Sequence, residues 1–280
     1  MNLTQARGPC CKAAGPCSPH PVLLQSLWDY VVCQLAPTVT SPFFPALLAF
    51  SCFIAFSLPF AVIDVLGKSC PFLYKYKIQK DKRPTLKMMG LCLRHALYNH
   101  TVYVSPAVVI NQLWMPVAPL PMAAPTLIEL VVEVLGCTLL FDFQYFVWHV
   151  LHHRVGWLYK NFHAIHHEYV APFALSSQYL GSVELLTMGF WSSTNPVLLK
   201  CHPLSAWASN VVSIWMSVED HIGYDFPWSL HRLVPCGLYG GARAHDLHHR
   251  KPNTNYAPFF RHWDMICGTT YVEHDKEQEA

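Results

Sequence analysis

The chain has 280 residues, of which 52% are hydrophobic and 13% charged, and its net charge is +2 with neutral histidines. An average soluble domain carries roughly 25% charged residues, so this composition favours an integral membrane protein. The small net charge gives no reason to expect nucleic acid as a partner.

Three apolar stretches predict transmembrane helices, since about 20 apolar residues cross a hydrocarbon core of about 30 Å. They are residues 43–66, 97–115 and 127–148. The first contains one charge, Asp64, and the second contains none. The third contains Glu129, Glu133 and Asp142, which must therefore meet partners or lie at an interface. The proline-rich segment 116–125 predicts a tight turn between the second and third spans.

The charge distribution predicts the topology. Within the segment 67–95, residues 67–87 alone contain seven Lys and Arg residues and a single acidic residue, Asp81. The positive-inside rule places such a loop in the cytosol. Residues 1–40 then form a lumenal tail, where Asn2 begins a glycosylation sequon. The sequon at Asn99 lies at the cytosolic boundary and should stay unmodified. Residues 41–148 hold the three spans and deliver residues 149–280 to the cytosol.

A fourth apolar region, about 183–219, predicts a membrane hairpin. Its two halves, 183–199 and 204–219, are separated by a short Lys-Cys-His-Pro turn, so the chain should enter the membrane and return to the same side. We expect this hairpin to line a route from the bilayer together with the aromatic residues Phe146, Trp148, Trp191 and Trp215.

Eleven cysteines are present, but their number is odd and no Cys-x-x-Cys pair occurs. A zinc ribbon or a disulfide framework is therefore a poor fit, and most of the cysteines are expected to be small apolar residues in helices. Cys10, Cys11 and Cys17 share the polar N-terminal tail and could pair if that tail is lumenal.

Nine of the seventeen histidines form three compact groups. These groups are His149-Val-Leu-His152-His153, His163-Ala-Ile-His166-His167 and His245-Asp-Leu-His248-His249. Side chains three and four apart on a helix share a face, so each group can direct its imidazoles at one point. Three groups that converge would supply eight or more nitrogens.

That number of imidazoles exceeds what one metal ion requires, because a structural zinc site takes four ligands and a catalytic one about three. Two six-coordinate ions with open positions fit better. Imidazole alone does not choose among iron, copper, nickel and zinc, but a site beside lipid favours iron and oxygen chemistry. We expect His221, at the end of the hairpin, to join His149, His153, His163, His166, His167, His245, His248 and His249 as ligands.

Two residues are candidates for positions behind the ligands. His152 is the doubtful member of its group, and Asp142 lies two helical turns before His149. Asp142 either accepts the second ring N–H of a ligand or is an interfacial charge. Glu129 and Glu133 are expected to cap or pair within the bundle. The other histidines are weaker candidates (His231, His262) or surface and core residues (His20, His95, His202, His274).

The three groups, His149/His153, His163/His166/His167 and His245/His248/His249, resemble the histidine boxes of the fatty acid hydroxylase superfamily. That superfamily includes sterol desaturases, sterol methyl oxidases and cholesterol 25-hydroxylases. The resemblance to the cholesterol 25-hydroxylases extends from about Trp28 to Tyr271. It is carried by Ser41-Pro-Phe-Phe-Pro45, residues 217–235, Tyr239-Gly-Gly241 and His262-Trp-Asp264.

The resemblance implies an all-α, multi-pass enzyme of the endoplasmic reticulum membrane with a cytosol-facing di-iron centre. It also implies O₂ as a substrate, and electrons from NAD(P)H through a separate redox partner. The expected reaction adds a hydroxyl to the side chain of cholesterol or a related sterol, at C25 if the resemblance holds throughout. Two alternatives remain open: a desaturase or C4-methyl oxidase with the same metal core, and a non-enzymatic membrane protein that binds metal or sterol.

Overall fold

The computed structural model describes residues 23–114, 116 and 118–271, and within them it contains helices and no β-strand. Two isolated β-bridges, Lys77–Tyr224 and Tyr239–Phe260, are the extended pairings found there. The predicted all-α class is confirmed for this part of the chain. The predictions for Asn2, Cys10, Cys11 and Cys17 lie outside the described residues.

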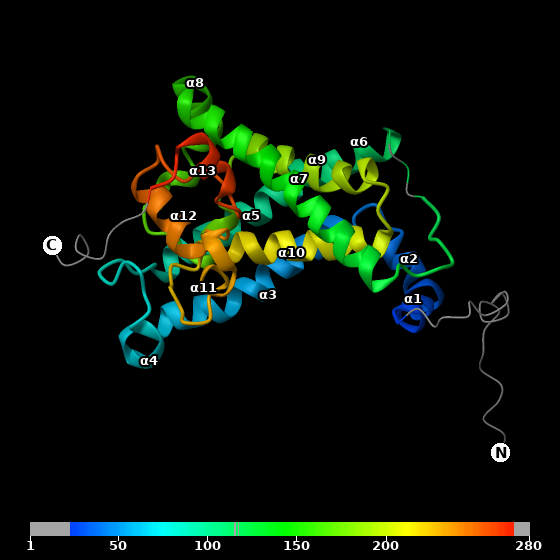
Figure 1. Cartoon of the computed structure of the whole chain (residues 1–280), viewed down its shortest axis with the longest axis horizontal. Coiled ribbons are helices and arrows are strands. Elements are labelled where there is room, and N and C mark those ends of the chain that lie inside the picture. Colours follow the sequence, from blue (N-terminus) through cyan, green and yellow to red (C-terminus); the bar gives the residue numbers. More distant parts are fainter. Residues whose placement is uncertain (1–22, 115, 117, 272–280) are drawn as a thin grey trace, which may run out of the picture.

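The helices follow one another closely along the chain (Figure 1). The α-helices are α1 (Gln25–Tyr30), α2 (Ala36–Val39), α3 (Phe44–Leu66), α4 (Pro71–Tyr74), α5 (Leu86–Asn99), α6 (Ser105–Trp114), α7 (Leu127–Arg154), α8 (Gly156–Leu158), α9 (Ser182–Leu198), α10 (Pro203–His221), α11 (Leu230–Leu233), α12 (Gly241–Arg250) and α13 (His262–Cys267). The π-helical segments are η2 (Val31–Leu35), η4 (His100–Val104) and η5 (Tyr159–His163). The 3₁₀ segments are η3 (Gly67–Ser69), η6 (His166–Glu168), η7 (Ala174–Gln178) and η8 (Pro235–Gly237).

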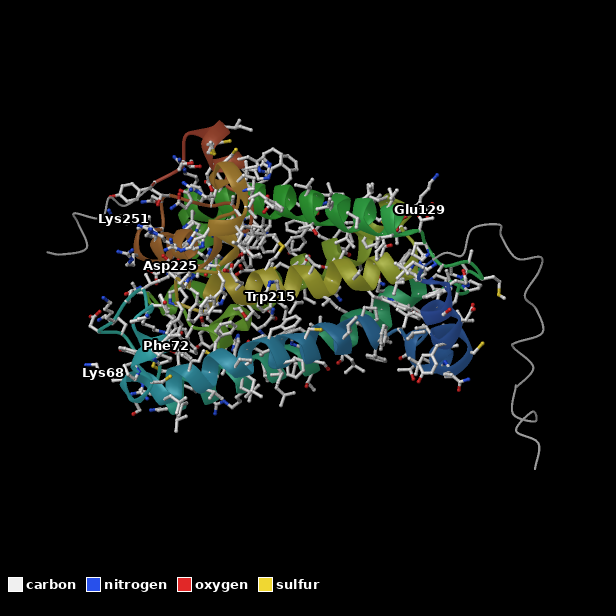
Figure 2. The ribbon with its side chains drawn as sticks, turned by 60° about the horizontal axis from the view of Figure 1, so that its bottom comes forward. Lys68, Phe72, Glu129, Trp215, Asp225 and Lys251 are labelled. Atoms are coloured by element: carbon white, nitrogen blue, oxygen red, sulfur yellow. The ribbon has the colours of Figure 1, made fainter. Side chains whose placement is uncertain are left out.

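Three long helices form the centre of the bundle. Helix α10 lies between α3 and α7 and packs on both, as the two views show (Figures 1 and 2). Helix α9 packs mainly on α7 and makes few contacts with α10. The region predicted as a hairpin forms α9 and α10, and these two helices pack on α7 more than on each other.

Two described helical stretches, Phe44–Ser69 and Leu127–Arg154, are long and apolar enough to cross a membrane. They correspond to the first and third predicted spans. Along α7 the outward face carries large apolar side chains that are 40–62% exposed: Val131, Val132, Leu135, Leu139, Phe143, Val147 and Leu151. Water solvates such a face poorly and lipid solvates it well, so the two helices support membrane association.

The second predicted span, 97–115, falls in a longer helical run made of α5, η4 and α6. The π-helical segment η4 interrupts this run, and it is not among the described stretches that are long and apolar enough to cross a membrane. The segment that follows it also differs from expectation. Residues 118–126 form an extended connection instead of a tight turn, and their carbonyl groups at Pro121 and Met122 accept hydrogen bonds from α1.

The single charge in the first span has a buried partner. Asp64 accepts a hydrogen bond of 2.7 Å from Nζ of Lys77 and one of 2.8 Å from the hydroxyl of Tyr224. An isolated charge would be costly there, whereas a paired and hydrogen-bonded one is tolerated. Lys77 belongs to the basic segment 67–95, and Gln79 of that segment bonds Asp246 of α12. The basic segment and the third histidine group therefore lie at the same end of the molecule.

Two acidic residues of α7 make hydrogen bonds at the opposite end of the molecule. Thr126 and Glu129 form a reciprocal capping box at the start of α7. Glu133 accepts a hydrogen bond of 3.0 Å from the backbone N–H of His202, in the turn between α9 and α10. The expectation that Glu129 and Glu133 cap or pair within the bundle is confirmed.

Candidate metal centre

Nine buried or half-buried imidazoles meet at the end of α7 and α10, in two adjacent groups. Group one, as we call it, is His149, His153, His163, His167 and His248; group two is His166, His221, His245 and His249. Within each group the potential ligand nitrogens all lie within 4.8 Å of one another. The two groups touch, since the rings of His167 and His249 have centroids 4.6 Å apart. The structure thus brings together all nine residues that the sequence nominated as ligands.

The sequence spacing explains how the histidines divide. Each box holds one pair four residues apart, and both members of a pair enter the same group: His149 with His153, His163 with His167, His245 with His249. Such pairs share a helix face. In the second and third boxes one further histidine crosses to the other group. His166 joins group two and His248 joins group one, because neighbouring residues on a helix point in different directions.

Local backbone geometry departs from a regular helix where the second box lies. His163 ends the π-helical segment η5, and His166 and His167 begin the 3₁₀ segment η6. π-Helical turns are rare in proteins, and those that occur are often found at functional sites. Here the change of helical pitch accompanies a box that supplies both groups.

Hydrogen bonds to backbone carbonyl groups determine where the protons of three rings lie. Nδ1 of His149 is 2.6 Å from the carbonyl oxygen of Tyr256, and Nδ1 of His248 is 2.7 Å from that of Thr254. His221 makes the same contact with the Ser217 carbonyl at 2.7 Å. A carbonyl oxygen only accepts, so Nδ1 of each ring carries the proton. The Nε2 lone pair of each ring is therefore free and directed into the centre.

The inward nitrogens are spaced as metal ligands would be. Successive Nε2 atoms lie 3.1–3.3 Å apart through group one and 3.0–3.3 Å apart through group two. Two nitrogens bound at right angles to one ion, each at about 2.1 Å, would lie about 3 Å apart. Lone pairs that face one another at this distance repel unless a cation lies between them. The residues present therefore fit two bound metal ions.

A buried carboxylate supports the centre of group one. Oε2 of Glu184, at the start of α9, lies 3.0 Å from Nδ1 of His163, and Oε1 accepts a hydrogen bond of 2.7 Å from the hydroxyl of Tyr145. Glu184 and His163 are completely buried. A carboxylate that accepts the outer N–H of a ligand histidine fixes its tautomer and makes it a stronger ligand. Glu184 was not predicted from the sequence; its position in the first turn of the apolar hairpin was the available signal.

Asp142 does not take the role suggested for it. Its carboxylate accepts the backbone N–H groups of Phe259 and Phe260 and the indole N–H of Trp263, at 2.8–3.2 Å. The expectation that Asp142 accepts a ring N–H of a ligand is wrong, because the Tyr256 carbonyl occupies that position behind His149. The alternative of an interfacial charge is also wrong, since Asp142 is fully buried.

His152 lies behind the centre and belongs to neither group. Its Nδ1 atom contacts the Trp148 carbonyl oxygen at 2.7 Å, and its ring stacks on that of Trp148 with centroids 3.5 Å apart. Of the weaker candidates, His231 pairs with Asp225 at 3.1 Å, and the ring of His262 contacts that of Trp263 at a tilt of 45°. Neither belongs to a group.

The remaining histidines are placed as expected or are not described. His95 contacts the Leu180 carbonyl oxygen, and His202 contacts that of Ala123. Both are structural contacts at a distance from the two groups. His20 and His274 lie outside the described residues.

Burial favours the neutral form of the imidazoles that lie outside the long helices. It lowers the pKa of His248 to about 3, and it also lowers the pKa values of His166, His167, His245 and His249. Repulsion among neighbouring imidazoles adds to the effect of burial. A neutral imidazole is the form that binds metal, so the pocket holds its nitrogens ready as ligands.

The segment that carries the Tyr256 carbonyl is itself anchored by a carboxylate. Asp264 accepts the backbone N–H groups of Tyr256 and Ala257, both at 2.8 Å. Asp264 and Asp142 together thus bind the backbone of residues 256–260. These bonds also fix the Tyr256 carbonyl group behind His149.

The sequence comparisons agree with this geometry. The fatty acid hydroxylase family profile matches residues 134–269, a range that includes all nine imidazoles. A cholesterol 25-hydroxylase-like protein (protein 1, member 2) of Danio rerio is 55% identical over 247 residues, which are 88% of this chain and 90% of the relative. The chain belongs to the fatty acid hydroxylase family. It is accordingly an enzyme of the hydroxylase type.

Other relatives align over a similar share of the chain. The cholesterol 25-hydroxylase of Homo sapiens is 47% identical over 253 residues, covering 90% of this chain and 92% of the relative. A cholesterol 25-hydroxylase-like protein of Caenorhabditis elegans is 36% identical over 259 residues, covering 92% and 86%. No solved structure matches the chain.

Proposed function

We propose that this family member is an O₂-dependent sterol hydroxylase that uses two iron ions and hydroxylates the cholesterol side chain, at C25. One observation carries the iron proposal: nine imidazoles divide into two touching groups of five and four ligand atoms. The substrate proposal rests on relatives that are named cholesterol 25-hydroxylase and that align along about nine-tenths of the chain.

Group one would hold one iron and group two the other, and the pair would supply the redox chemistry that activates O₂. The overall reaction consumes a sterol C–H bond, O₂, two electrons and two protons, and it yields the sterol alcohol and water. The electrons would come from NAD(P)H through a separate redox partner.

The protein's own contribution is to position the ligands and to exclude water. Carbonyl groups and Glu184 hold the rings, as described above. An apolar cluster of Phe141, Tyr145, Met216, Tyr239 and Phe259 lies directly beside the centre, and Trp148 and Trp191 pack against it. A sterol side chain would find an apolar, largely dry surface there, while the neutral imidazoles keep their nitrogens for the metal.

We further propose that the protein resides in the endoplasmic reticulum membrane with this centre at the cytosolic face. The basic segment 67–95 and the histidine groups lie at one end of the molecule, which agrees with the positive-inside orientation. Asn2 would then be lumenal and open to glycosylation. Mobility-shift analysis of N2Q and N99Q variants tests this, because only N2Q should lose a glycan; loss from N99Q would reverse the orientation.

Sterol turnover tests the function directly. Membranes from cells that express the protein would be supplied with isotopically labelled cholesterol, and the products identified by mass spectrometry. We expect a product heavier by one oxygen atom, absent with His166→Ala and retained with His262→Ala, whose imidazole lies outside both groups. A product lighter by two hydrogens would indicate a desaturase instead. Iron binding without any sterol product would contradict the substrate proposal.

A further inference from the structure

A small, partly open polar cavity lies between α7, α9 and α10. Five of the eight residues around it have amide or hydroxyl side chains: Ser192, Asn195, Ser209, Asn210 and Ser213. The cavity contains about 10 Å³ of space, which suits a single hydroxyl group or water molecule. Polar groups inside a membrane bundle are costly and tend to mark functional positions.

The polar side chains around the cavity retain capacity to bind a hydroxyl. Asn195 is 1% exposed and exchanges two hydrogen bonds with Gln144, at 2.8 and 3.0 Å. Ser209 is 5% exposed; its hydroxyl donates to the Ala206 carbonyl and also contacts the thiol of Cys137 across the cavity. One turn earlier on α10, the hydroxyl of Ser205 is fully buried and has no partner among the described residues.

The cavity lies at the same separation from the histidine groups along α7 and along α10. Cys137, at the cavity, precedes His149 by twelve residues on α7, and Ser209 precedes His221 by twelve on α10. At 1.5 Å per residue each separation is about 18 Å. A sterol extends through about one leaflet, or roughly half of a 30 Å hydrocarbon core. A sterol with its hydroxyl in the cavity would therefore bring the end of its side chain to the histidines.

The surface between the two sites is apolar and aromatic. Phe141 lines the cavity and also belongs to the cluster beside the centre, where Met188, Trp191 and Trp215 pack from α9 and α10. Trp215 lies in the C-terminal half of α10, six residues before His221 (Figure 2). These side chains are only partly buried, and α9 and α10 make few contacts with each other. A flat, rigid ring system that enters from the bilayer would have to displace these side chains between the two arms.

We propose that this cavity binds the 3-hydroxyl of the sterol and thereby determines which side-chain carbon reaches the metal centre. The inference rests on the proposed function and extends it, because it makes a free hydroxyl a requirement of the substrate. Sterols whose hydroxyl is esterified or etherified would be excluded. Ser209 and Asn195 act as specificity-determining residues in this arrangement, about 18 Å from the chemistry.

Equilibrium binding of tritiated cholesterol to the purified protein, in competition with unlabelled cholesterol or cholesterol 3-methyl ether, tests the proposal. The wild-type protein should prefer cholesterol by about 10- to 100-fold, because the ether leaves buried polar groups unpaired. Ser209→Ala should reduce that preference about fivefold or more and leave the affinity for the ether unchanged. Ser193→Ala is the matched control: Ser193 is exposed on α9 and bonds the Gly189 carbonyl, so the preference should stay.

Equal binding of both sterols by the wild-type protein would overturn the proposal, as would a Ser209→Ala variant that weakens both equally. Ser192→Ala, at a half-buried position of the cavity, replaces Ser209→Ala if that variant does not fold. The outcomes also separate the two proposals. A hydroxyl preference without turnover would support the cavity and contradict the hydroxylase, whereas turnover without a preference would support the hydroxylase and contradict the cavity.

Discussion

Oε2 of Glu184 lies 3.0 Å from Nδ1 of His163, and neither side chain is exposed. The carboxylate reaches the ring from α9, and the same carboxylate accepts the hydroxyl of Tyr145 from α7. Helix α9 is therefore linked directly to a histidine of group one. A movement of α9 would change the position of Glu184 and thereby the orientation of the His163 ring.

Glu184→Gln should weaken metal binding in group one by roughly 10- to 100-fold, which is the usual effect of losing a partner of a ligand histidine. The amide is neutral and makes a weaker hydrogen bond to the ring than the carboxylate does. Iron retention during titration with a chelator, followed by elemental analysis, measures the change. Glu168→Gln is the control, because Glu168 is exposed on the neighbouring segment and contacts Tyr179. Equal retention in both variants would contradict the assigned role.

The division of the imidazoles into two groups predicts how the metal content changes. His153→Ala removes a ligand of group one and His245→Ala a ligand of group two. The wild-type protein should contain two irons per chain, each variant about one, and the double variant almost none, since each site loses a ligand that it requires. His152→Ala should keep both irons. Loss of both irons from either single variant would show one shared site instead of two.

The sequence sufficed to identify the histidines that gather in the two groups because the information is local. A pair such as His149 and His153 shares a helix face whatever surrounds it, and the boxes keep this spacing. The residues behind the ligands depend on contacts between distant segments. Glu184 reaches His163 across 21 residues, and Tyr256 reaches His149 across 107. No spacing rule within one helix predicts such contacts. The helical spacing of Asp142 and His149 therefore suggests a contact that the structure does not contain.

The fold shows the same limit. Length and hydropathy predicted α3, α7 and the hairpin, because a long apolar stretch has few alternatives to a helix in a membrane. The second predicted span lacks charges, but it contains polar residues such as Asn99, His100 and Asn111, and the helix there changes pitch at η4. The tail predicted for residues 1–40 includes residues 23–40, which form packed helices because Trp28 is buried against the 118–126 connection.

Acidification should destabilise the centre. Burial lowers the pKa of His248 to about 3, whereas an unfolded histidine titrates near 6.5. Below pH 6.5 the unfolded chain therefore binds more protons than the folded chain, and stability falls as the pH decreases towards 3. His166, His167, His245 and His249 act in the same direction. Thermal unfolding of the detergent-solubilised protein should show a midpoint that is constant above about pH 7 and decreases below pH 6.5.

Protonation also competes with metal, so iron should be released over the same pH range. His231→Ala is a suitable control, because His231 pairs with Asp225 outside both groups and the acid transition should remain. A midpoint that does not change between pH 7 and pH 4.5 would contradict neutral, buried imidazoles.

Asp142→Ala should destabilise the protein by about 3 kcal/mol, because it leaves the N–H donors of Phe259, Phe260 and Trp263 without their acceptor. These donors hold the C-terminal segment against α7, and that segment supplies the Tyr256 carbonyl behind His149. The variant should therefore also lose iron from group one before group two. Thermal unfolding and iron content, measured on the same preparation, test both effects. A variant that unfolds earlier but loses both irons together would show that Asp142 supports the fold without a particular influence on His149.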